Sequence, residues 1–127
     1  GYYSDPYDDF GRLAMEIWRA ARLVVDTGIH DKKWTREQAV QYLLDNTPNP
    51  EGDCQKAIDR YIVMPGQATA YKIGMLKIVT LREMAKTELG DRFDIRDFHD
   101  VVLRDGAVPL AILEQNVRAW VDETKAN

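Results

Sequence analysis

Apolar residues recur at every third or fourth position over long segments of this chain, and this helical spacing limits the available folds more than any other feature. The first such segment runs from Tyr7 to about Asp26 and predicts one amphipathic helix with a buried apolar stripe. Gly28 is expected to end this helix as a left-handed cap. The stripe consists of Phe10, Leu13, Ala14, Ile17, Ala20, Ala21 and Val24.

Capping and turn residues divide the rest of the chain into further helices. Thr35 and Gln38 form a capping box, and Asp94 is a second N-cap. The helices expected after the first one cover about 36–45, 51–63, 68–89, 95–104 and 109–124. No segment shows the alternation of a half-buried strand. The sequence therefore predicts an all-α fold, a compact unit of about six helices that forms a single domain over residues 1–127.

Composition excludes several classes of protein. The 17 Lys and Arg residues against 21 Asp and Glu residues give a net charge of -4, which provides no basic footprint for nucleic acid. The single cysteine excludes an intrachain disulfide and a cysteine-rich zinc site. No apolar run is long enough to span a membrane, and no stretch has the pattern of a signal peptide.

The segment from Arg22 to His30 is the first candidate site. Arg22 and Asp26 are four residues apart and share a helix face, and His30 lies where a helix C-terminus favours a protonated imidazole. One interpretation is a surface ion pair with a capping histidine, since such pairs are common and weak. The other is that this segment belongs to a functional site.

The segment from Asp59 to Lys72 is the second candidate site. A Pro-Gly break is flanked by Arg60, Tyr61, Gln67 and Tyr71, which brings several hydrogen-bond donors to one helix N-terminus. Such an arrangement favours anions and developing oxyanions. The alternative is a plain turn between packed helices, with both tyrosines as core aromatic residues.

Other features carry less information. Residues 1–7 contain three tyrosines, which either bind a partner or form a frayed end. His30, His99 and Cys54 would have to converge from three separate elements to hold a metal, so no metal site is expected within this sequence. A redox or metal sensor based on Cys54 rests on one thiol alone.

The longer motifs resemble one family. They are Ser4 to Tyr7, Arg22 to His30, Trp34 to Ala39, Arg60-Tyr61, Pro65 to Ala68 and Tyr71 to Gly74. Their order and spacing are similar to those of a bacterial domain-of-unknown-function family, number eight hundred and eighty-five. Members of this family resemble the gluzincin metallopeptidases, all-helical relatives of angiotensin-converting enzyme and the thermostable carboxypeptidases.

The resemblance implies that the chain is the C-terminal part of a longer protein of the cell envelope or periplasm, secreted or lipid-anchored. The family's zinc motifs, a His-Glu segment with Pro-Gly-His and a later Glu-Gly-Trp segment, lie upstream of the matched region. This chain is therefore expected to bind no catalytic zinc and to be inactive alone, while the full-length parent binds zinc. Its partners would be the N-terminal part of the same protein and a peptide substrate. We also expect a dimer through exposed apolar surface.

The same resemblance implies roles for individual residues. Tyr71 and Tyr61 are the expected catalytic residues, with Tyr71 as the oxyanion donor. Arg60, Gln67, His30 and Asp26 are the expected substrate-binding residues. The chain would then form the substrate-binding and oxyanion-stabilising wall of a peptidase cleft. The alternative is a non-catalytic helical binding or scaffold domain of a cell-envelope protein.

Overall fold

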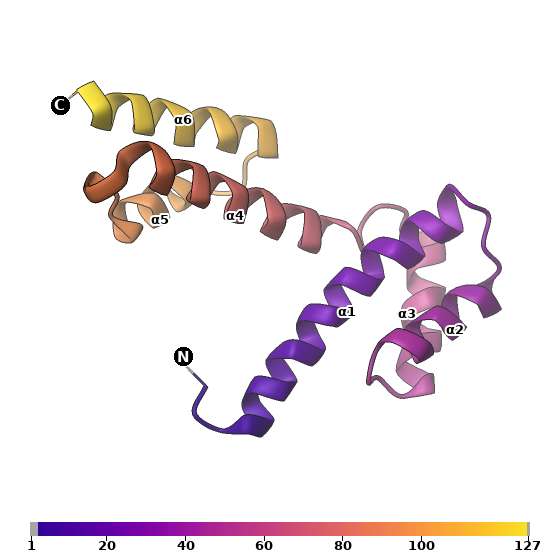
Figure 1. The fold of residues 1–127 in the computed structure, drawn as a ribbon. Helices are drawn as coiled ribbons and strands as arrows, with labels where there is room; N and C mark the ends of the chain where they lie inside the picture. Colours follow the sequence, from indigo (N-terminus) through magenta and orange to yellow (C-terminus); the bar gives the residue numbers. More distant parts are fainter. Residues whose placement is uncertain (1–2, 127) are drawn as a thin grey trace. The chain divides into compact units, whose positions relative to one another are not determined.

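The computed structural model describes residues 3–126, and within that range the chain is helical with no strand. The all-α prediction is confirmed. Six α-helices and one short 3-10 helix, η1, make up the described part of the chain (Figure 1). Their bounds are α1 Pro6–His30, α2 Arg36–Asn46, α3 Glu51–Val63, α4 Ala70–Leu89, η1 Gly90–Arg92, α5 Ile95–Arg104 and α6 Leu110–Ala126.

Contacts divide the chain into two compact units, residues 1–73 and residues 74–127, and the division falls inside α4. The prediction of a single domain stays a prediction, because a division by contacts does not decide whether the two units fold separately. The candidate residues all lie in the first unit.

In the first unit, α2 and α3 pack against each other and against the C-terminal half of α1 (Figure 1). The predicted capping box at the start of α2 is confirmed. The backbone N–H of Gln38 donates to Thr35 Oγ1 at 3.2 Å, and Thr35 N–H donates to Gln38 Oε1 at 2.9 Å. The buried core of this unit comprises Ala21, Val25, Ala39, Val40, Leu43, Cys54, Ala57, Ile58, Tyr61 and Ala68.

The prediction that Gly28 caps the first helix is wrong. The helix continues to His30, and Gly28 is buried within it. The physical reason is the close approach of Trp34, whose backbone N–H donates to the Gly28 carbonyl at 2.9 Å. A Cβ at residue 28 would lie 2.5 Å from Trp34 Cε3, so this position requires glycine for space.

The predicted apolar stripe of the first helix is buried only at one end. Ala21 is buried, whereas Phe10, Leu13, Ile17 and Val24 are exposed. The cause is that the buried positions of α1 lie between residues 21 and 28, where α2 and α3 cover it. The N-terminal half of α1 therefore presents an apolar face that the first unit leaves uncovered.

The second unit packs α4, α5 and α6 around an apolar core. Asp94 caps α5 as predicted, and its carboxylate accepts from the backbone N–H of Arg96. Gly90 and Gly106, which follow α4 and α5, both have positive φ. The core consists of Leu81, Ala85, Leu89, Phe98, Val101, Leu113, Val117 and Val121.

Candidate functional site

Both candidate segments of the first unit meet in one polar cluster, which we call the Arg22 cluster. It joins the C-terminal half of α1, the end of α3, the turn that follows α3 and the start of α4. Its members are Arg22, Asp26, His30, Tyr61, Gly66, Gln67 and Tyr71. All of these residues lie within residues 1–73, so the cluster belongs to the first unit alone.

Arg22 lies at the centre of this cluster and is 7% exposed. Its Nη2 donates to Gln67 Oε1 at 3.1 Å. Its guanidinium carbon is 4.4 Å from the ring centroid of Tyr71 and 5.3 Å from that of Tyr61, which is cation–π geometry. Its Nε has no hydrogen-bond partner. Within residues 3–126, none of the ion pairs includes Arg22, so the buried charge has aromatic and amide neighbours and no carboxylate partner.

Asp26 holds the turn that follows α3. Its buried carboxylate accepts the backbone N–H of Gly66 at 2.9 Å and 3.2 Å, one distance to each oxygen. Gly66 has φ of 80°, a left-handed conformation that favours glycine. The bond to Asp26 therefore fixes the Pro65-Gly66 corner against α1 and sets the position of Gln67.

His30 ties the end of α1 to the end of α3. Its Nε2–H donates to the backbone carbonyl of Tyr61 at 2.9 Å, and Nε2 is 3.7 Å from Asp26 Oδ1. A carbonyl only accepts, so this contact places a proton on Nε2. The Nδ1 atom of His30 is then the ring nitrogen available to an external group.

The two predicted catalytic tyrosines differ in their surroundings. Tyr61 is fully buried, and its hydroxyl has no hydrogen-bond partner. Tyr71 is 48% exposed, and its hydroxyl accepts from Gln67 Nε2 at 3.4 Å. Because the Tyr71 oxygen serves as an acceptor toward Gln67, its own proton remains available to a group outside the chain.

Arg60 lies at the edge of the cluster. It is exposed, and its guanidinium carbon is 5.3 Å from the Tyr61 ring centroid.

A neighbouring contact fixes α3 to α2: Arg36 donates to both oxygens of Asp59, at 2.6 Å and 3.1 Å. The side-chain hydrogen bond from Arg36 lowers the pKa of Asp59.

The structure thus brings Asp26, His30, Gln67 and both tyrosines into one cluster, with Arg60 beside it. The interpretation of Arg22 and Asp26 as a surface ion pair is wrong, because both side chains are buried and each has other partners. Sequence reasoning therefore missed the central place of Arg22. The available signal was a charged residue within the apolar run Ala20 to Val25.

No group of three His, Cys, Asp or Glu side chains within residues 3–126 lies close enough together to hold a metal ion. The donors of the Arg22 cluster are one carboxylate and one imidazole, both bonded to the backbone. These residues do not fit a catalytic zinc ion. The sensor hypothesis for Cys54 also has little support from its surroundings, because the thiol is buried and burial raises its pKa.

The tyrosine-rich start of the chain remains outside the cluster. Of the tyrosine-rich start, Gly1 and Tyr2 lie outside the described residues, whereas Tyr3 and Tyr7 are exposed.

Across the described part of the chain, none of the helices combines the length and the apolar character needed to cross a membrane.

Comparison with known proteins identifies the family. Residues 1–117 match the family described as "Bacterial protein of unknown function (DUF885)". The chain is also similar to a crystal structure of "the putative lipoprotein from Colwellia psychrerythraea", with 57% sequence identity and a TM-score of 0.93. The alignment covers 96% of this chain and 21% of that one, so the chain spans about a fifth of the length of this relative. No curated protein matches the chain. With most of its length matched by one family, the chain belongs to the bacterial DUF885 family.

Proposed function

We propose that, in a longer DUF885 protein, this region forms the substrate-binding and oxyanion-stabilising wall of a zinc-dependent peptidase cleft. The single observation that carries the proposal is the environment of Tyr71. Its half-exposed ring lies against the buried, positively charged Arg22, and its hydroxyl oxygen accepts from Gln67. A phenol held in this way, beside a cation and with its proton free, is suited to donate to a developing oxyanion.

The other members of the cluster support Tyr71 in distinct ways. Arg22 orients the Gln67 amide by bonding its oxygen, so the Gln67 nitrogen is directed to Tyr71. Asp26 fixes the turn that carries Gln67. His30 has Nδ1 available for a substrate carbonyl or carboxylate when it is protonated. Tyr61 is buried, so we assign it the role of positioning Arg22.

The zinc ion belongs to the parent protein in this proposal. The described residues contain no ligand set for it, so the proposed role of this region is confined to binding and orienting the substrate and stabilising charge. We further propose a location in the cell envelope. This proposal is supported by the relative that is described as "the putative lipoprotein from Colwellia psychrerythraea".

The test is the Tyr71→Phe substitution in the full-length protein, assayed on a peptide library for cleavage. Loss of one oxyanion donor is expected to lower kcat by about 100-fold or more with little change in KM, because the contact forms in the transition state. Tyr42→Phe is the matched control, since Tyr42 is a partly buried tyrosine of the same unit outside the cluster. An unchanged kcat for Tyr71→Phe would remove Tyr71 from the mechanism.

A non-catalytic binding or scaffold role is the second candidate. It is favoured by the fact that Asp26 and His30 both bond the backbone of their own chain, which is what a structural clamp requires. Under this alternative, no peptide is cleaved by the wild-type protein, and variants of the Arg22 cluster change only stability.

A further inference from the structure

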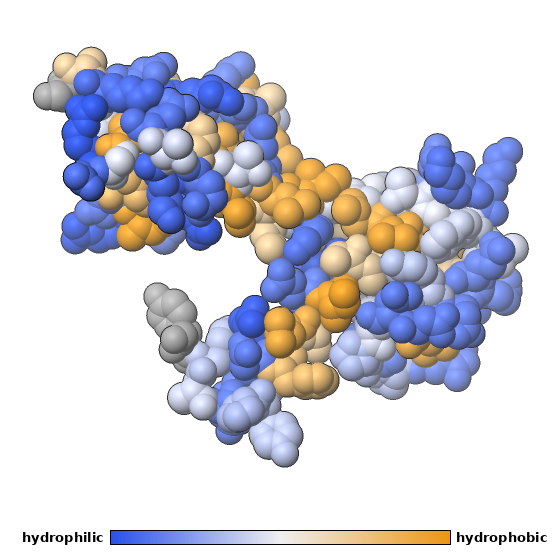
Figure 2. Space-filling view, in the orientation of Figure 1, coloured by the Kyte–Doolittle hydropathy of each residue, from blue (hydrophilic) through white to orange (hydrophobic). Residues whose placement is uncertain are grey.

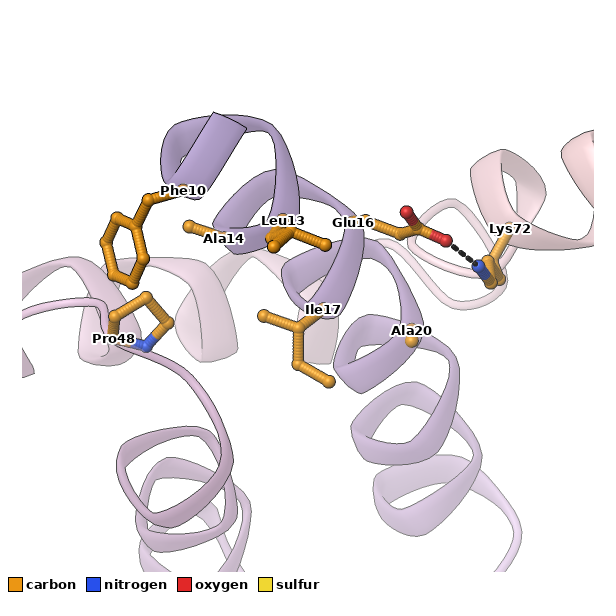
Figure 3. Close-up of a pocket in the computed structure, with 8 residues that line it drawn as sticks. All are labelled: Phe10, Leu13, Ala14, Glu16, Ile17, Ala20, Pro48 and Lys72. Carbon is orange, nitrogen blue, oxygen red and sulfur yellow. Dashed lines mark hydrogen bonds and ion pairs between the residues drawn. The ribbon is translucent and has the colours of Figure 1, made fainter. Parts of the chain in front are cut away.

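The N-terminal half of α1 forms one side of an apolar groove whose lining contains no member of the Arg22 cluster. The groove has a volume of about 490 Å³, and Figure 3 shows the Phe10 ring beside Pro48, which approaches from the α2–α3 connection. Figure 2 shows hydrophobic side chains gathered along this half of α1. The lining residues are Phe10, Leu13, Ala14, Glu16, Ile17, Ala20, Pro48 and Lys72.

The shape of this surface matches a helix as its occupant. The apolar side chains of α1 follow one another at three- and four-residue spacing, which produces a continuous seam along the helix axis. Phe10, Leu13 and Ile17 are all exposed along it. Small residues, Ala14 and Ala20, alternate with these larger ones, so ridges and hollows are present for interdigitation.

An ion pair between Lys72 and Glu16 lines part of the groove. The Lys72 side chain is only 15% exposed, and its ammonium group has Glu16 Oε1 as its partner at 3.4 Å (Figure 3). An ammonium group has three donors, so this long contact leaves capacity for a further acceptor. An occupant with an apolar face would cover the apolar side chains of the groove. A carbonyl or carboxylate oxygen beside that face would accept a hydrogen bond from Lys72.

We propose that the occupant is an amphipathic helix from the chain that precedes residue 1 in a family-length DUF885 protein. Most of the length of the Colwellia psychrerythraea relative lies outside the region that this chain covers, so such a protein has ample further chain to supply the helix. Phe10 follows the start of α1 at Pro6 by about one turn, which gives a preceding segment a short route to the groove. This proposal concerns assembly and does not depend on catalysis.

The test compares two cysteine variants of the full-length protein, Leu13→Cys and Met15→Cys. The two native side chains are equally exposed, at 49% each, and lie on the same helix. Leu13 lines the groove, whereas Met15 is about 200° around the helix from it. Each variant is treated with a maleimide, and the modified peptide is quantified by mass spectrometry over time. Circular dichroism establishes that both variants are folded.

We expect Leu13→Cys to react at least about tenfold more slowly than Met15→Cys at every protein concentration, because labelling then requires local opening. Equal rates for the two variants would overturn the proposal, since the groove would then be uncovered. Protection of Leu13→Cys that disappears on dilution would also overturn it, and would identify a second copy of the protein as the occupant. A peptidase assay of the same samples tests the proposed function separately, so the failure of one proposal is distinguishable from the failure of the other.

Discussion

Trp34 lies directly against the backbone of Gly28, so that a Cβ at residue 28 would stand 2.5 Å from Cε3 and 2.6 Å from Cδ2 of the indole. This contact closes the connection between α1 and α2. It is reinforced by the hydrogen bond from the backbone N–H of Trp34 to the Gly28 carbonyl. The ring of Trp34 also packs against Tyr42, with centroids 5.6 Å apart.

The Gly28→Ala substitution is therefore expected to lower the free energy of unfolding by about 1–3 kcal/mol, because the added methyl group displaces the indole. Gly11→Ala is the matched control in the same helix, where a Cβ meets nothing within 4 Å. That control is expected to raise stability by about 0.5–1 kcal/mol through its better helix propensity. Urea unfolding followed by circular dichroism measures both. Equal effects of the two substitutions would show that the Trp34 contact contributes little.

The contrast between Gly28 and the confirmed helix caps shows which parts of the fold were predictable. Thr35 and Asp94 act through residues close to them in the chain, so local sequence was sufficient to place them. Gly28 resembles a cap locally, but its role depends on a tryptophan in the following connection. Helix end and helix interior were not distinguishable there from spacing alone.

The Arg22 cluster was predictable only in part for the same reason. The sequence singled out both of its segments, and the family resemblance singled out Tyr71. The partners themselves are distant in the chain: Gln67 is 45 residues from Arg22, and Gly66 is 40 residues from Asp26. Such pairings depend on the packing of α3 against α1, which no helical period encodes. The visible neighbour four residues away suggested an ion pair that does not form.

Asp26 is expected to contribute to stability through the Pro65-Gly66 turn. Asp26→Ala removes the acceptor that the structure gives the Gly66 N–H, and a hydrogen bond to a charged group contributes about 1.5–3 kcal/mol. Asp26→Asn retains one acceptor oxygen, so its loss should be clearly smaller. Hydrogen exchange at the Gly66 amide, together with urea unfolding, tests both variants. Unchanged amide protection in Asp26→Ala would contradict the assignment.

Asp94 is expected to make the stability of the second unit dependent on pH. The side-chain hydrogen bond from Arg96, followed by the backbone N–H of the same residue, lowers the Asp94 pKa from 3.8 to about 2. The charged carboxylate therefore stabilises the fold above the ordinary pKa, and this contribution is lost as the pH falls through the folded-state pKa.

The measurement is the thermal midpoint of wild-type protein and of Asp94→Asn between about pH 6 and pH 2. Asparagine is also a good N-cap, so the difference between the two proteins isolates the charge. Wild type should be more stable near neutral pH, and the difference should shrink between about pH 4 and pH 2. A difference that stays constant over this range would show that the Arg96 contacts do not favour the ionised form.

Arg22 provides the sharpest separation of stability from function. A buried guanidinium without a carboxylate partner is costly to hold, so Arg22→Met should leave the free energy of unfolding of the chain within about 1 kcal/mol of wild type, or raise it. In the full-length protein, the same variant should lower peptidase kcat, because Gln67 and Tyr71 lose the group that orients them. Arg22→Lys keeps the charge without the guanidinium geometry, so it should also lower kcat. Urea unfolding and a cleavage assay, run on the same variants, measure the two effects. A loss of several kcal/mol in Arg22→Met with unchanged activity would identify Arg22 as a structural residue.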